Sequence, residues 1–120
     1  MADARPRPLP CAARVRHRRD FQAIFATRRA CAVGPLVVHA GDNALGHCRI
    51  GLAVGRKVGH APRRNRIKRL LREAFRHVQH DLPSHLDLVV VVSPHEPLTW
   101  AAYAQLLVSA ATQLTGAGRA

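Results

Sequence analysis

The side chains best suited to chemistry in this sequence are the cations gathered between positions 63 and 76. That stretch holds seven Arg and Lys residues and a single acid, Glu73. Cationic side chains bind phosphate through charge-assisted hydrogen bonds, and Arg can form two at once because its guanidinium is planar. A charged helix face that meets only water usually carries both signs. The excess of one sign therefore predicts that this segment binds a polyanion.

An apolar repeat of helical period runs through the same stretch. Its members are Ile67, Leu70, Leu71, Ala74, Phe75 and Val78. This spacing predicts a helix from about Pro62 to His80. Four cations then form one i, i+4 ridge of roughly 18 Å along the helix flank, and two further polar residues lie beside it. The ridge is Arg64, Lys68, Arg72 and Arg76, with Asn65 and Arg69 next to it.

The first turn of this predicted helix is unfavourable for an isolated protein. Arg63, Arg64 and Arg66 lie where the helix dipole favours anions, at a cost of about 0.3 kcal/mol or more each. Glu73 can pair with Arg69 or Arg76 and relieves part of the repulsion. A phosphate backbone supplied from outside would turn these unfavourable charges into binding energy.

Other residue types that could do chemistry are scattered. The seven carboxylates form no evident acid/base pair, and the sequence has no G-x-S-x-G motif. Of eight histidines, His77 and His80 alone share a helical neighbourhood, and Cys11, Cys31 and Cys48 lack C-x-x-C spacing. We expect no catalytic residue and no metal ligands in this chain, and we expect reduced thiols in a cytoplasmic protein.

The charge is unevenly distributed along the 120 residues. The chain has a net charge of +12; positions 1–80 carry 18 Arg and Lys against four acids, and positions 81–120 carry one against three. The length suits one domain, predicted at 14–115, after a flexible basic tail at 1–13 that is rich in Pro. The longest apolar run, Leu88 to Val92, is too short for a membrane span, so we expect no membrane association.

Further elements would have to position the basic helix. Phe21, Ile24 and Phe25 mark a short helix at about 17–28, and Leu36 to His39 reads as a strand. Leu88 to Val92 reads as a strand buried on both faces, and Thr99 is a plausible N-cap of a last helix. A strand, a helix and a second strand suggest a βαβ crossover in a mixed sheet, so the fold class is α+β or α/β.

The predicted strand at 48–54 alternates apolar and other residues, and one of its faces is bare. Gly51 and Gly55 leave room for another chain or a nucleic acid to approach, or for a helix to pack against small residues. A helix-turn-helix reader of DNA would need a helix directly before the basic one, where a strand is predicted. This favours RNA, recognised by shape and backbone.

The segment from Lys57 to Arg76 resembles the signature of the bacterial ribonuclease P protein component. From Val58 to Glu73 it reads V-G-x-A-x-x-R-N-R-x-K-R-x-x-R-E. Similarity to the family extends over about residues 14–112 and includes the stretches 18–25, 50–54 and 87–92. The resemblance implies an α+β fold, a compact αβββαβα sandwich with a mixed sheet and a left-handed βαβ crossover, like the second domain of ribosomal protein S5.

The resemblance also implies a role. Such a protein is the small partner of an RNA enzyme that removes the 5′ leader of precursor tRNA by hydrolysis, and the RNA holds the catalytic Mg²⁺. The implied partners are one catalytic RNA per protein monomer and precursor tRNA. The implied contacts to the catalytic RNA are Arg63, Arg64, Asn65, Arg66, Lys68, Arg69, Arg72 and Arg76. The implied contacts to the leader are Phe21, Phe25, His39, Arg56 and Lys57.

Two other functions fit the residues. A structural RNA-binding protein of ribosomal type would need the same basic face but no site for a leader. A DNA-binding regulator would show affinity that depends on duplex sequence. Phe21 and Phe25 can also be read as core residues, and for at least one of them we favour that reading.

Overall fold

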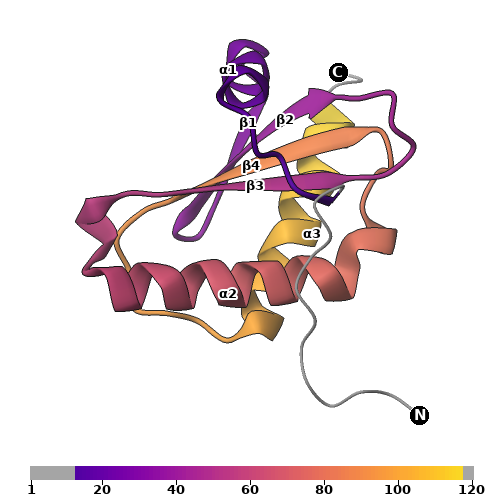
Figure 1. Cartoon of the computed structure of the whole chain (residues 1–120). Helices are drawn as coiled ribbons and strands as arrows, with labels where there is room; N and C mark the ends of the chain where they lie inside the picture. The colour runs from indigo at the N-terminus through magenta and orange to yellow at the C-terminus, as the bar shows by residue number, and fades with distance from the viewer. Residues whose placement is uncertain (1–12, 118–120) are drawn as a thin grey trace.

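The computed structural model describes residues 13–117, which form a four-stranded mixed sheet with helices on both faces (Figure 1). The strands are β1 (Ala30–Val33), β2 (Leu36–Asp42), β3 (Arg49–Val54) and β4 (Leu86–Val92), in the order β1-β2-β4-β3. β4 runs parallel to β3 and antiparallel to β2. Its central place explains why nearly every residue of this strand is buried, as its unbroken apolar run predicted.

The helices lie in two layers. α1 (Arg18–Ala26) crosses one face of the sheet, and α2 (Ala61–Val78) and α3 (Trp100–Ala117) cover the other (Figure 1). Two 3-10 turns, η2 (Arg56–Val58) and η3 (Gln79–Asp81), precede and follow α2. None of the helices within residues 13–117 is both long enough and apolar enough to cross a membrane.

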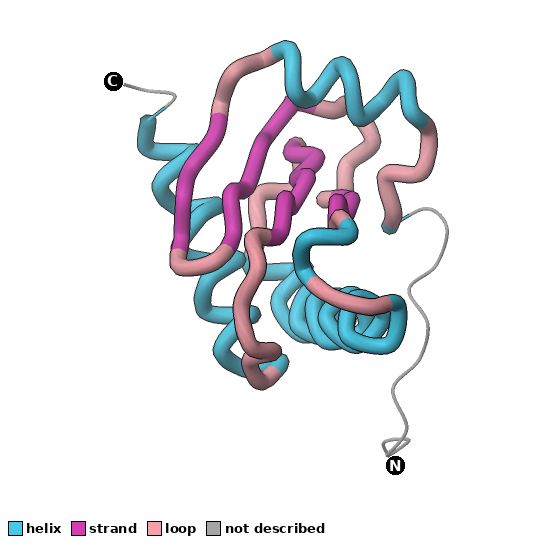
Figure 2. Tube along the Cα trace, turned by 90° about the vertical axis from the view of Figure 1, so that its left-hand side faces the viewer, coloured by secondary structure: helices cyan, strands magenta, loops and turns pink. Residues whose placement is uncertain are grey.

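The connection from β3 through α2 to β4 is left-handed. In Figure 2, β3 and β4 both run toward the viewer, β3 lies to the right of β4, and α2 lies beneath them. The chain therefore turns clockwise in this view on its way from β3 through α2 to β4, which is the left-handed sense for strands directed at the viewer. Crossovers of this kind are right-handed in nearly all proteins. The predicted sandwich, with its mixed sheet and unusual crossover, is confirmed.

Alternation along the strands builds two apolar layers. Leu36, Val38, Leu88 and Val90 are buried with the helices α2 and α3. The residues that alternate with these along each strand face α1, where the fully buried Val89 packs with Val15 and Ile24. Cys31 and Cys48 are free thiols, and Cys11 lies outside the described residues.

Several element boundaries differ from the sequence predictions. The strand β1 was not predicted from its own residues; it joins β2 through Gly34, whose φ is +55°. β2 continues to Asp42. α1 ends at Ala26 because Thr27 Oγ1 donates a hydrogen bond to the Ala40 carbonyl at 2.6 Å and the chain turns there. Thr99 caps α3 as predicted, accepting a hydrogen bond from the Ala102 N–H at 3.2 Å.

One buried carboxylate ties three segments together. Asp87 of β4 is 5% exposed and accepts two hydrogen bonds from the Arg49 guanidinium, at 2.8 and 2.6 Å. The amide of Asn43 donates to the same carboxylate at 2.6 Å. Arg49 also lies 4.0 Å from Asp20 of α1. This network joins β3, β4 and the β2–β3 loop, and it reaches the start of α1.

Candidate RNA interface

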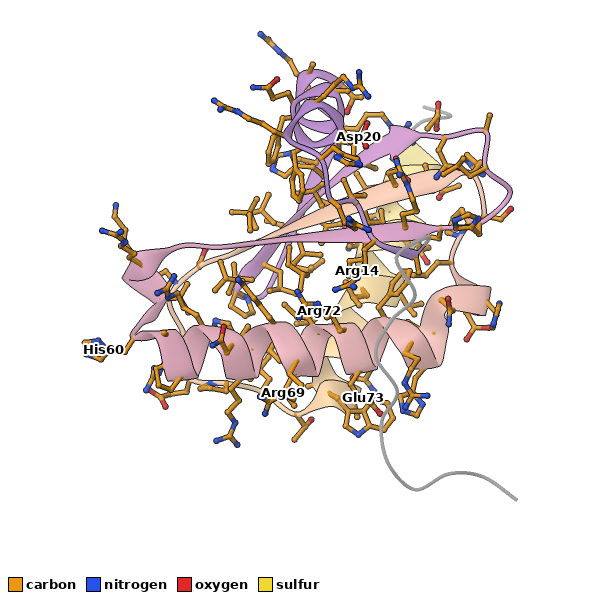
Figure 3. The ribbon with its side chains drawn as sticks, in the orientation of Figure 1. Arg14, Asp20, His60, Arg69, Arg72 and Glu73 are labelled. Carbon is orange, nitrogen blue, oxygen red and sulfur yellow. The ribbon has the colours of Figure 1, made fainter. Side chains whose placement is uncertain are left out.

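The cations of α2 form two rows that differ in exposure. One row is half-buried against the edge of the sheet and consists of Arg64, Lys68 and Arg72. The other, Asn65, Arg66 and Arg69, is exposed. Figure 3 shows Arg72 directed toward Arg14 and Arg69 directed away from the sheet. The helix therefore presents cations in two directions, over the edge strand β3 and outward.

Acidic side chains neutralise the two ends of this cation set. Arg63 lies 3.2 Å from Glu96, and Arg76 donates two hydrogen bonds to Glu73 at 2.7 and 3.2 Å. These hydrogen bonds from Arg76 are the main reason why the pKa of Glu73 lies below its usual value. Of the two partners that the sequence allowed for Glu73, the structure has Arg76, and His77 joins it at 2.9 Å. The cations between Arg63 and Arg76 form no ion pair within the described residues.

A pocket at the edge of β3 collects more positive charge. It has a volume of about 240 Å³, and among the described residues its lining includes four cations but no acid. They are Arg14, Arg16, Lys68 and Arg72. Burial, followed by the nearby charge of Arg14, lowers the pKa of Arg72. The Nε atoms of Arg14 and Arg64 are buried and have no hydrogen-bond partner in the described part of the chain. This unbalanced charge suits an anion such as a phosphate group.

Arg14 and Arg16 were missed as site residues by sequence reasoning. They lie just beyond the predicted tail, outside any helical period. The segment pairs with the edge of β3, where the Val15 N–H donates to the Ile50 carbonyl at 2.9 Å. The available signal was the basic stretch from Arg14 to Arg19, in which four of six residues are Arg. Ala13, the one described residue of the predicted tail, is buried.

Three of the predicted leader residues lie together beside α1. The rings of Phe25 and His39 meet edge to face with centroids 4.8 Å apart, and those of Phe21 and Phe25 are 6.5 Å apart. Phe25 is 38% exposed. His39 Nδ1 is buried and has no hydrogen-bond partner among residues 13–117, and burial lowers the pKa of this imidazole.

Phe21 fills the bare face of β3. A Cβ atom built on Gly51 would lie 2.8 Å from Cζ of Phe21, so the ring needs a glycine there. Phe21 is half-buried, which fits the expectation that at least one of the two Phe residues packs in the interior. At Gly51 a helix, rather than another molecule, occupies the space. At Gly55 a Cβ would meet nothing within 4 Å.

Arg56 and Lys57 lie apart from the aromatic group. Strand pairing aligns Gly51, Val89 and His39, whereas the two exposed cations follow the far end of β3, on the order of 15 Å away along the strand. Figure 1 shows the strands continuing beyond α1 in that direction. The half-buried Val37, Ala53 and Val91 line the face between. The five predicted leader residues therefore lie at the two ends of one strip on the sheet, with the three rings at one end and the two cations at the other.

Metal ligands are not grouped in the described part of the chain: within residues 13–117, no three His, Cys, Asp or Glu side chains lie together as such a site requires. The fold and the site define a class, that of small α+β proteins with a cationic helix suited to polyanions. The family model described as Ribonuclease P matches residues 9–115. The chain therefore belongs to the ribonuclease P protein family, and the resemblance drawn from its motif is confirmed.

Individual relatives agree with this assignment. A protein of Chlamydia abortus named ribonuclease P protein component is 38% identical over 90 residues, 74% of this chain and 65% of that one. One of the same name from Oleidesulfovibrio alaskensis is 48% identical over 80 residues, 65% and 64% of the two chains. The chain thus spans slightly less than two thirds of the length of these two relatives.

Solved structures show the same fold. The Staphylococcus aureus RNase P protein, as a mutant with defective mRNA degradation activity, superposes with a TM-score of 0.75 at 27% identity. The match covers 87% of this chain and 89% of that one. The Thermotoga maritima RNase P protein, in complex with 1-(4-fluorophenyl)-2-thiourea, gives 0.70 at 33% identity, over 80% and 94% of the chains.

Proposed function

We propose that this chain is the protein subunit of ribonuclease P, which binds the catalytic RNA and the 5′ leader of precursor tRNA. It assists the endonucleolytic removal of the leader, which leaves the mature 5′ end of the tRNA. In this proposal it acts in the cytoplasm as a monomer, bound 1:1 to the catalytic RNA. Membership of the family supports the role, and the geometry supports the assignment of surfaces.

The observation that carries the proposal is the set of cations on α2 that have no acidic partner within residues 13–117. Lys68 and Arg72 line the pocket at the edge of β3, Arg64 precedes them in the same half-buried row, and Arg66 and Arg69 are exposed. A folded RNA surface could supply phosphates to both rows. Each neutralised phosphate releases counterions, so binding should weaken steeply as salt rises.

We assign the strip beside α1 to the leader. Phe25 and His39 offer ring surfaces at one end, and Arg56 and Lys57 offer charge at the other. Aromatic faces combined with a few cations suit a single strand with little sequence preference. The spacing on the order of 15 Å implies that several nucleotides would be needed to span the strip.

The same residues argue for hydrolysis by the RNA. Guanidinium and ammonium groups dominate the interface, and such groups donate hydrogen bonds but have no lone pair with which to accept a proton from water. They can bind and orient phosphates. We therefore assign the water-activating chemistry to Mg²⁺ ions, which the RNA subunit would hold.

Multiple-turnover cleavage of a precursor tRNA by the catalytic RNA at low Mg²⁺ tests the proposal. Wild-type protein should stimulate the reaction, and the Arg64→Ala/Arg69→Ala protein should lose most of the stimulation. Arg76→Ala is the matched comparison, with a smaller expected loss because Glu73 already binds that guanidinium. A folded wild-type protein that gives no stimulation with its own RNA would favour the structural RNA-binding alternative.

Crosslinking separates the two surfaces. A photoreactive nucleotide in the leader should crosslink near Phe25 and His39, and one in the catalytic RNA should crosslink to α2. A structural RNA-binding protein would give the second crosslink without the first.

A further inference from the structure

The outward surface of α1 is a second cationic surface, separate from α2. It comprises Arg18 and Arg19 at the start of the helix and Arg28 just after its end. All three are exposed, and within the described residues none of them forms an ion pair. Figures 1 and 2 both place α1 on the side of the sheet opposite α2. An RNA surface bound to α2 could reach the outward surface of α1 only by wrapping around the sheet.

The acid of this helix does not balance these charges. Asp20 is turned toward Arg49 at 4.0 Å and stays on the sheet side. Arg18 and Arg19 occupy the first turn, where the helix dipole opposes cations, and the side chain of the N-cap residue His17 makes no capping hydrogen bond to the described residues. Arg28 has a φ of +57°, an unusual conformation for this residue type. The charges are exposed at an electrostatic cost, as on α2.

The shape and composition of the surface point to a duplex. Gln22, Ala23 and Ala26 are exposed between the two groups of Arg, and none of them can stack on a base. α1 stands out from the sheet (Figure 1), and its charged ends are about 12 Å apart along the helix, from the rise of 1.5 Å per residue. A-form RNA has a wide, shallow minor groove and is recognised through phosphates and 2′-hydroxyls on both sides of it.

The position of α1 indicates which RNA would supply that duplex. One flank of α1 borders the strip that we assign to the leader, which is covalently joined to the stem of the precursor. We propose that the outward surface of α1 binds the double-stranded backbone of the precursor tRNA, so that the protein holds substrate and catalytic RNA on opposite faces of one sheet. This inference rests on the proposed function.

Three cations are changed together to test it. In Arg18→Gln/Arg19→Gln/Arg28→Gln the charge is lost while length and polarity are kept, and the matched control replaces the same residues with Lys. Holoenzyme affinity is measured for a precursor tRNA with its leader and for mature tRNA without one. We expect the Gln protein to bind both about 3- to 10-fold more weakly. Its plot of log affinity against log salt should be shallower by about 2 to 3 units, and the Lys protein should resemble wild type.

Other results would overturn the inference. A loss seen with the leader-bearing RNA alone would assign the surface to the single strand. A comparable loss of affinity for the isolated catalytic RNA would assign it to that RNA, and unchanged affinity for every RNA would leave the surface without this role. Arg64→Ala/Arg69→Ala, measured in parallel, reports separately on the proposed function, since it should weaken binding of the catalytic RNA. Unfolding curves of each variant confirm that it is folded.

Discussion

Arg72 lies against Arg14 across the edge of β3, in a pocket whose described lining includes two further cations and no acid. Burial, followed by the charge of Arg14, disfavours the protonated form of Arg72 and lowers its pKa. An anion in this pocket would relieve the repulsion. We therefore predict that sulfate stabilises the folded protein more than chloride does at equal ionic strength.

The size of the effect follows from mass action. At a sulfate concentration ten times its Kd the gain is about 1.4 kcal/mol, which raises the melting temperature by several degrees in a domain of this size. Arg14→Gln/Arg72→Gln should remove most of the difference between the two salts. Thermal unfolding measures the difference in stability between the two salts. An equal difference for wild type and variant would contradict the prediction.

The contact between Phe21 and Gly51 gives a second prediction. Gly51→Ala places a methyl group 2.8 Å from the Phe21 ring and 3.1 Å from Val15 Cβ, so the interior must shift. We expect a loss of about 1 to 3 kcal/mol in the free energy of unfolding, measured by urea denaturation. Gly55→Ala, directly after the end of β3, is the matched control, because a Cβ there meets nothing within 4 Å among the described residues. If both variants lose the same amount, the close approach of Phe21 is not the cause.

His39 predicts a pH dependence of stability. Burial lowers the pKa of His39 in the folded state, so between that lowered pKa and about 6.5 the unfolded chain binds more protons than the folded one. Stability should therefore fall as the pH drops through this window. His39→Phe keeps a ring beside Phe25 but cannot titrate. Between pH 7.5 and pH 5.0 the melting temperature should drop less for the variant than for the wild-type protein. The other seven histidines are common to both proteins. Equal drops would rule out a contribution of His39.

Among the carboxylates of the described residues, we expect the substitution of Asp87 to lower the free energy of unfolding most. Asp87→Ala leaves the Arg49 guanidinium, 18% exposed, without its two strong hydrogen bonds. Breaking a buried ion pair in this way costs about 3 kcal/mol. Asp42→Ala removes the more exposed pair with Arg29 and should cost less than about 1 kcal/mol. Chemical denaturation of the two variants compares them directly, and similar losses would show that burial is not decisive here.

The sequence by itself determined the elements whose pattern is local. The apolar period from Ile67 to Val78 predicted α2, the run from Leu88 to Val92 predicted a strand buried on both faces, and Thr99 predicted the start of α3. The family motif on α2 identified the family and, through it, the sandwich. Such features depend on neighbours within one or two turns or along one strand, and these are visible in the order of residues.

Only the tertiary structure decided which charges and rings meet. Glu96 neutralises Arg63 from 33 positions away, and Arg14 reaches Arg72 because its segment pairs with the edge of β3. The distance between His39 and Arg56 depends on strand register, and the bare face of β3 is filled by Phe21 from another element. These relationships arise from packing between segments far apart in the chain, on which the local period of the sequence places no constraint.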